Sequence, residues 1–114
     1  MKKYSYTIPL YYGKLEVIIA DDFNLAATQY KIETNGYTVN NWEALTSWKQ
    51  QVFTIIARPS IKPEIIAHES AHVVNRLFKE VFIDLDYDND EAFCYMLSWV
   101  VKQVYVSLDK CNRK

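Results

Sequence analysis

The chain has 114 residues, half of them hydrophobic and 15% aromatic, with a net charge of −1 and a pI near 6.1. This length and apolar share suit one core, so we expect residues 1–114 to form a single domain. A near-neutral chain lacks the basic patch that neutralises phosphates, which argues against a nucleic-acid partner. No apolar run approaches the roughly eighteen residues of a membrane span, and two cysteines make no disulfide framework. We therefore expect a cytoplasmic protein without a membrane segment.

The N-terminal part of the chain predicts a β-hairpin followed by a short helix. Residues 4–10 and 15–20 are rich in β-branched and aromatic side chains, and Tyr12-Gly13-Lys14 between them supplies turn chemistry. Aspartates open the segment 21–30, whose remaining residues tolerate a helix. A hairpin and one short helix thus precede the middle of the chain.

The middle of the chain predicts irregular structure and then one strand. Asn35-Gly36 is a strong turn dipeptide, and the polar stretch 38–47 has neither a helical nor a strand period. Residues 51–57 predict a strand with apolar side chains on both faces, ended by Pro59. If this strand is an exposed edge it can pair with an extended peptide, and otherwise it is a central strand of the sheet.

The C-terminal half predicts two helices, over about 61–80 and about 89–109. In the first, Pro63 suits the first turn and Glu64 complements the positive end of the helix dipole. Each helix has an apolar stripe at helical spacing. In the first helix the stripe contains Ile66, Ser70, Val73, Val74 and Leu77, and in the second it contains Phe93, Met96, Leu97, Val100, Val101, Val104 and Leu108.

Both histidines of the chain belong to one motif, His68-Glu69-Ser70-Ala71-His72, of the form H-E-x-x-H. Residues four apart share one face of a helix, so both imidazoles can reach one metal ion. The helical wheel places them nearly opposite the apolar stripe, facing solvent or a cleft. The motif therefore predicts half of a zinc site, and the alternative is an ordinary amphipathic helix with two solvated histidines.

A catalytic zinc site needs a third protein ligand, and no histidine follows His72. The acidic run 84–91 offers carboxylates, most of which we expect to be solvated or to cap the second helix. Glu91 is the preferred candidate because it falls in the first turn of that helix, opposite the apolar stripe, where it would face the first helix across a cleft. If Glu91 is not the ligand, Asp84, Asp86 and Asp88 are the next candidates.

These residues support metal-assisted hydrolysis. Zinc on His68, His72 and Glu91 would lower the pKa of a bound water, and Glu69 would take its proton as general base. Tyr95, one turn after Glu91, is the candidate donor to the transition-state oxyanion, and the alternative for Tyr95 is an aromatic ring packed at the helix interface.

The motif followed nineteen residues later by Glu91 resembles the gluzincin branch of zinc metallopeptidases, in which such a Glu is the third ligand. The segment 89–97 also resembles small H-E-x-x-H proteins of phages and mobile elements, with the similarity running from about residue 51 to 107. The ImmA/IrrE-type peptidases are a more distant likeness. The resemblance implies a zincin-like fold, a zinc cofactor and a peptide or protein substrate.

The sequence thus predicts an α+β protein with a minimal zincin-like fold. A small twisted sheet, made of the N-terminal hairpin and strand 51–57, would pack on the H-E-x-x-H helix and the C-terminal helix. The predicted function is a cytoplasmic zinc metallopeptidase. The alternative is a metal-stabilised binding or regulatory protein of a phage or mobile element, without catalysis. A fourth protein ligand that closes the metal shell would favour this alternative.

Overall fold

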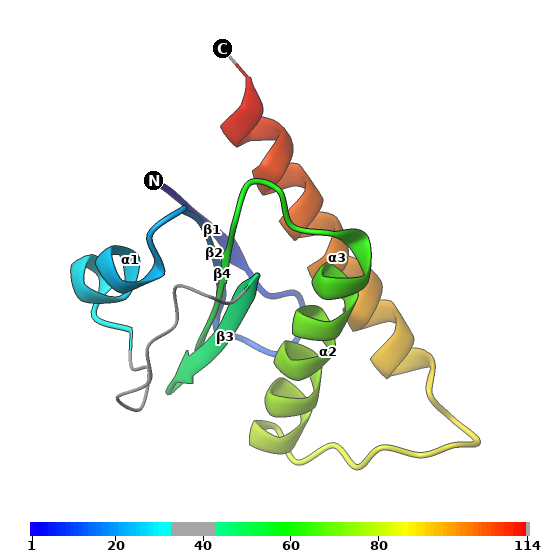
Figure 1. The fold of residues 1–114 in the computed structure, drawn as a ribbon. Coiled ribbons are helices and arrows are strands. Elements are labelled where there is room, and N and C mark those ends of the chain that lie inside the picture. Colours follow the sequence, from blue (N-terminus) through cyan, green and yellow to red (C-terminus); the bar gives the residue numbers. More distant parts are fainter. Residues whose placement is uncertain (33–42, 114) are drawn as a thin grey trace.

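The computed structural model describes residues 1–32 and 43–113, and Figure 1 shows their arrangement. The predicted turn at Asn35-Gly36 and the residues 38–42 lie outside this part. The elements in chain order are β1 (Lys2–Thr7), β2 (Lys14–Ile19), α1 (Phe23–Tyr30), β3 (Ala44–Lys49), β4 (Val52–Ala57), α2 (Pro63–Glu80) and α3 (Glu91–Asn112).

The described strands form a four-stranded mixed sheet in the order β1-β2-β4-β3. The pairs β1–β2 and β3–β4 are antiparallel, whereas the two central strands, β2 and β4, run parallel. Helices α2 and α3 lie on one side of the sheet and α1 on the other (Figure 1). The α+β class expected from the sequence is therefore confirmed.

Burial on both faces explains the apolar composition of the central strands. Alternate side chains of β2 and β4, such as Val17 and Ile55, pack into the larger core beneath α2 and α3. Those between them, Ile18 and Ile56, pack into a smaller core with Phe23 of α1. A strand buried on both faces reads as a nearly continuous apolar run, and this is the pattern of both segments.

Two predictions about the strands need correction. The first strand of the hairpin ends at Thr7, since residues 8–13 form the connection. Residues 44–47, predicted as loop, belong to β3, which pairs with β4 over its whole length. Of the two alternatives for the 51–57 strand, the central position is the correct one, and β3 is the edge strand next to α2. The segment 44–49 forms a strand because it pairs with β4, since its own sequence has little strand signal.

At Gly13 the connection between β1 and β2 comes into close contact with the connection between β3 and β4. Its φ is +91°, and a Cβ there would lie 2.4 Å from the carbonyl oxygen of Gln51. The same oxygen accepts a hydrogen bond from the backbone N–H of Lys14 at 2.9 Å. Glycine is thus required both for the left-handed conformation and for the close approach.

The three helices lie close to their predicted positions. Asp22 caps α1 by accepting a hydrogen bond from the backbone N–H of Leu25 at 3.0 Å, whereas α2 starts at Pro63 with no side-chain cap. The predicted stripe of α2 is buried, and that of α3 is buried or packed against the core. No helix in the described ranges combines the length and the apolar character needed to cross a membrane.

Two fully buried serines lie in the long helices in opposite hydrogen-bonding states. The hydroxyl of Ser107 in α3 bonds the Tyr6 hydroxyl at 2.7 Å and donates to the Gln103 carbonyl at 2.8 Å. The Ser70 hydroxyl in α2 is the buried side-chain polar atom without a partner among the described residues. Burying an unpaired hydroxyl costs free energy, while a satisfied one contributes stability.

We therefore expect Ser70→Ala to raise the free energy of unfolding by about 1 kcal/mol and Ser107→Ala to lower it by a similar amount. Both changes remove one oxygen from a helix interface, so each is the matched control for the other. Urea unfolding followed by circular dichroism measures both. Equal destabilisation by the two substitutions would contradict this account of Ser70.

Candidate metal centre

The two motif histidines converge on one point beside α2. Both side chains are exposed, their Nε2 atoms lie 3.1 Å apart, and their rings meet edge to face at 83°. Zinc binds imidazole nitrogen at about 2.0–2.1 Å, so two such ligands at a tetrahedral ion are about 3.3 Å apart. The separation of the two nitrogens therefore suits two ligands of one zinc ion.

The histidines line a cavity of about 590 Å³ between α2 and the edge strand β3. One wall is α2 and the other is β3, whose alternation directs every second side chain toward the helix. The lining is mostly apolar around a small polar group, and consists of Glu43, Ala44, Leu45, Thr46, Trp48, Ile65, His68, Glu69 and His72. A concave, largely apolar site with a few polar side chains is typical of ligand binding.

Glu69 points toward β3, where Thr46 holds it. The Thr46 hydroxyl donates a hydrogen bond to Oε2 of Glu69, and both side chains line the same cavity as the histidines. The bond ties the Glu69 carboxylate to the edge strand through one of its two oxygens. The carboxylate predicted as the general base is thus anchored beside the two imidazoles.

Trp48 and Arg76 extend this side of the molecule beyond the histidines. Arg76 follows His72 by one helical turn, and its guanidinium carbon lies 4.7 Å from the Trp48 ring centroid. Arg76 Nε also pairs with Glu80 at 3.4 Å. A guanidinium over the face of an indole is a stabilising cation–π contact, so it fixes the orientation of Trp48 in the cavity wall.

The other two predicted site residues, Glu91 and Tyr95, lie elsewhere. Both line a hollow of about 280 Å³ with the connection between β1 and β2, including Leu10. Glu91 does begin α3 as predicted, but it faces this connection and not the histidines. Within residues 1–32 and 43–113, no three His, Cys, Asp or Glu side chains are grouped so that they could hold a metal.

Sequence reasoning missed the contributions of β3. Glu43, Thr46 and Trp48 all line the histidine cavity, yet they fall in or beside the stretch predicted as loop. The one available signal was the alternation of Ala44, Thr46 and Trp48 against the residues between them, which is short and weakly apolar. Among the described residues, Glu43 and the motif's own Glu69 are the carboxylates that share the cavity with the histidines.

A comparison of the chain with protein-family models, with curated proteins and with solved structures finds no match in any of the three.

The cysteine nearest to Glu91 has a raised pKa. Partial desolvation of the Cys94 thiol and then the carboxylates of Asp90 and Glu91 raise its pKa above the ordinary value. A thiol is nucleophilic as the thiolate, and these two carboxylates disfavour that form. Cys94 is therefore poorly suited to act as a nucleophile at neutral pH.

We expect the double substitution Asp90→Asn and Glu91→Gln to speed the alkylation of Cys94 by iodoacetamide at pH 8, because a lower pKa increases the thiolate fraction. The measurement is made in a Cys111→Ser background, with mass spectrometry following the reaction. Asp109→Asn, on the last turns of α3, is the control and should leave the rate unchanged. An unaltered rate in the double variant would show that the two carboxylates do not set the thiol pKa.

Proposed function

We propose that this protein is a zinc-dependent hydrolase of peptide bonds, built as a minimal zincin-like domain. The observation that carries the proposal is the convergence of the His68 and His72 Nε2 atoms at 3.1 Å, in a cavity that also contains Glu69. Their spacing of four residues places both rings on one face of α2, and the 3.1 Å separation is that of a hydrogen bond between the two nitrogens, which a zinc ion bound to both would replace. The phage or mobile-element setting and the cytoplasmic location come from the sequence resemblance and composition.

The residues of the cavity fit zinc in type as well as in spacing. Imidazole nitrogen and carboxylate oxygen are common zinc ligands, and catalytic sites use three protein ligands with one position left for water. When bound, zinc lowers the pKa of that water and polarises the carbonyl of the substrate. His68 and His72 are the first two ligands of the proposed site.

Two carboxylates compete for the third position. Glu91 matches the gluzincin pattern by its spacing from the motif, although it lies in the hollow beside Leu10. Glu43 shares the histidine cavity and stands at the start of the edge strand. Glu91 must approach the histidines to bind the same ion, whereas Glu43 needs a smaller rearrangement within one cavity. Their effects on zinc content distinguish them.

Glu69 is the proposed general base. Glu69 follows His68 directly in the helix, so the two side chains point in different directions. The Glu69 carboxylate nevertheless lines the same cavity as the His68 ring. In the proposed reaction Glu69 takes the proton of the attacking water and later gives it to the leaving amine. Thr46 orients the carboxylate through its hydroxyl, so Thr46 is a positioning residue.

The edge strand suits a peptide substrate. Among the described strands, β3 pairs with β4 alone, so its other edge can accept an extended peptide as a further strand. Such a peptide would run past Thr46 and Trp48 along the histidine cavity. Because four of the nine lining residues are apolar (Ala44, Leu45, Trp48 and Ile65), we propose that the cavity accepts an apolar side chain of the substrate.

The zinc site is tested by elemental mass spectrometry of protein purified without added metal or chelator. We expect about one zinc per chain in the wild type and the loss of most of it in His68→Ala and His72→Ala. Whichever of Glu91→Ala and Glu43→Ala also loses zinc identifies the third ligand. Asn75→Ala, an exposed substitution on the same helix, should retain the metal.

Absence of zinc from the wild type, even after zinc is supplied in excess, would refute the proposal. If the zinc survives in both glutamate variants, the third ligand is sought among Asp84, Asp86 and Asp88. A zinc shell completed by four protein ligands would favour the non-catalytic alternative, because such sites are structural.

The hydrolytic step is tested with Glu69→Gln, which keeps the shape of the side chain and removes the base. We expect zinc binding and stability to be preserved while cleavage of a fluorescence-quenched peptide library falls about 10²–10⁴-fold. Thr46→Val should lower kcat with zinc retained, and Thr46→Ser should restore it, because serine also carries a hydroxyl. Equal activity of Glu69→Gln and wild type would exclude the proposed mechanism.

A further inference from the structure

The largest exposed apolar side chains gather at one end of the molecule. Among the described residues, the six large apolar side chains that are at least 60% exposed are Leu10, Tyr12, Phe82, Leu85, Tyr87 and Tyr95, which we call the apolar end surface. Phe82 is 94% exposed and Tyr87 fully so, whereas exposed apolar residues elsewhere, such as Leu25, reach at most 54%. Clustered exposure of this kind is typical of interaction sites.

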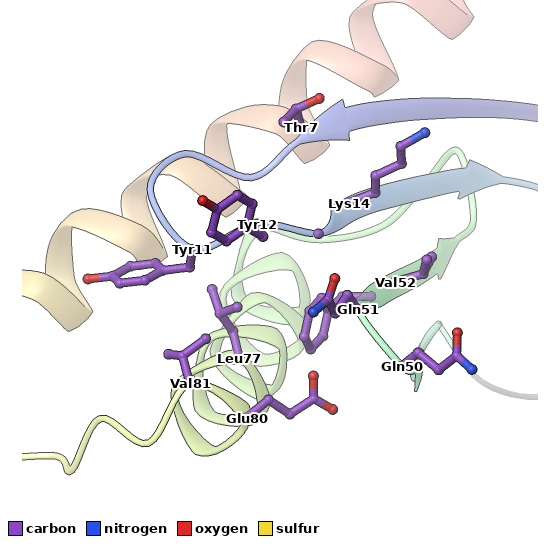
Figure 2. A pocket seen from close by; sticks show the side chains of 12 residues that line it. Thr7, Tyr11, Tyr12, Lys14, Gln50, Gln51, Val52, Leu77, Glu80 and Val81 are labelled. Atoms are coloured by element: carbon purple, nitrogen blue, oxygen red, sulfur yellow. The ribbon is translucent and has the colours of Figure 1, made fainter.

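These residues come from segments that lie side by side. Leu10 and Tyr95 line one hollow, which places the β1–β2 connection against the start of α3. Tyr12 lines a second hollow, of about 860 Å³, together with Val81 at the end of α2 (Figure 2). Phe82 follows Val81 directly. The β1–β2 connection therefore lies against the end of α2 and the start of α3, and the segment 81–90 that carries Phe82, Leu85 and Tyr87 joins these two ends.

The backbone is strained at three of the six residues of this surface. Leu10, Tyr12 and Phe82 have φ values of 70°, 61° and 61°, in the left-handed region that favours glycine and asparagine. All three side chains are also at least 80% exposed, so they bury little apolar surface within the isolated chain. Both the strain and the exposure are costs that a bound partner can offset.

The charge around the surface indicates the chemistry of that partner. Residues 80–101 contain six carboxylates and no Lys, Arg or His, although the whole chain has a net charge of only −1. A second copy bound through the same surface would bring these carboxylates together, and an anionic membrane would be repelled by them. A partner with Lys or Arg beside apolar side chains complements both properties.

We propose that the apolar end surface docks a basic, amphipathic segment of another protein. The apolar side chains of the segment cover Leu10, Tyr12 and Phe82, and its cations face the carboxylates of residues 84–91. None of the six residues of the surface lines the histidine cavity, so the docking does not involve His68, Glu69 or His72.

The test uses the full chain and a synthetic amphipathic peptide of Lys and Leu, with a Glu and Leu peptide of the same pattern as control. We expect the Lys peptide alone to bind, with amide chemical-shift changes confined to residues 8–13 and 80–96. Raising the salt concentration should weaken binding, because cation–carboxylate attraction is screened. Equal binding of the Glu peptide, or shifts spread over the whole chain, would overturn the proposal.

Two sets of variants separate docking from folding. The first variant combines Leu10→Asn, Tyr12→Asn and Phe82→Asn. It should weaken peptide binding about tenfold or more. Its stability should be kept or raised, because asparagine tolerates a positive φ. The second variant combines Asp84→Asn, Asp86→Asn and Asp88→Asn. It should weaken peptide binding and reduce the dependence of binding on salt. Leu25→Gln with Tyr105→Gln, exposed apolar residues elsewhere, is the control.

Unchanged peptide binding in the variant that replaces Leu10, Tyr12 and Phe82, or a loss of stability in it, would show that these three residues serve the fold. Dimerisation of the wild type in sedimentation experiments, abolished by the same substitutions, would show that the surface binds a second copy instead. Zinc content is measured in parallel. It should not change in the variant that replaces Leu10, Tyr12 and Phe82, because none of these is a candidate zinc ligand, so a failure here is distinct from a failure of the proposed zinc site.

Discussion

The parallel pairing of β2 with β4 is the constraint on which the rest of the structure depends. Parallel neighbours cannot be joined by a tight turn, so the chain between them must leave the sheet and return. Here it forms α1 on one face and then β3, which pairs on the outer side of β4. Helix α2 follows β4 directly and packs back on the opposite face from α1. The edge strand and the histidine helix are thereby neighbours.

The burial of α2 then decides what faces this edge. Its apolar stripe, with Val73 and Val74 fully buried, fits against the sheet and α3. A helix with one face fixed in a core has no freedom to turn, so His68 and His72 are held on the side next to β3. Thr46 reaches Glu69 for the same reason. Core packing therefore decides which side of α2 faces β3, and the Thr46–Glu69 hydrogen bond then fixes the carboxylate there.

The local sequence pattern was sufficient to predict the elements with a strong hydrophobic period. It was insufficient to predict those that form only by pairing with distant segments. The hairpin, β4 and both long helices follow from apolar spacing, as does the outward direction of the histidines. Strand β3 does not, because its short and half-polar sequence becomes a strand only by pairing with β4. Glu91 was placed correctly at the start of α3. Which neighbour it faces depends on how α3 packs against the β1–β2 connection, and helical periodicity carries no information on that.

The arrangement around Glu69 favours hydrolysis over a purely structural metal. A metal that only ties elements together needs a closed set of ligands, and a carboxylate anchored next to it without binding it would have no role. Glu69 is such a carboxylate, fixed by Thr46 inside an open, mostly apolar cavity next to two convergent imidazoles. In a binding protein stabilised by metal, the Thr46–Glu69 bond would only tie β3 to α2. A hydrolase gains an oriented base at the position where a water molecule must be deprotonated, and this difference is the physical reason to prefer the enzyme.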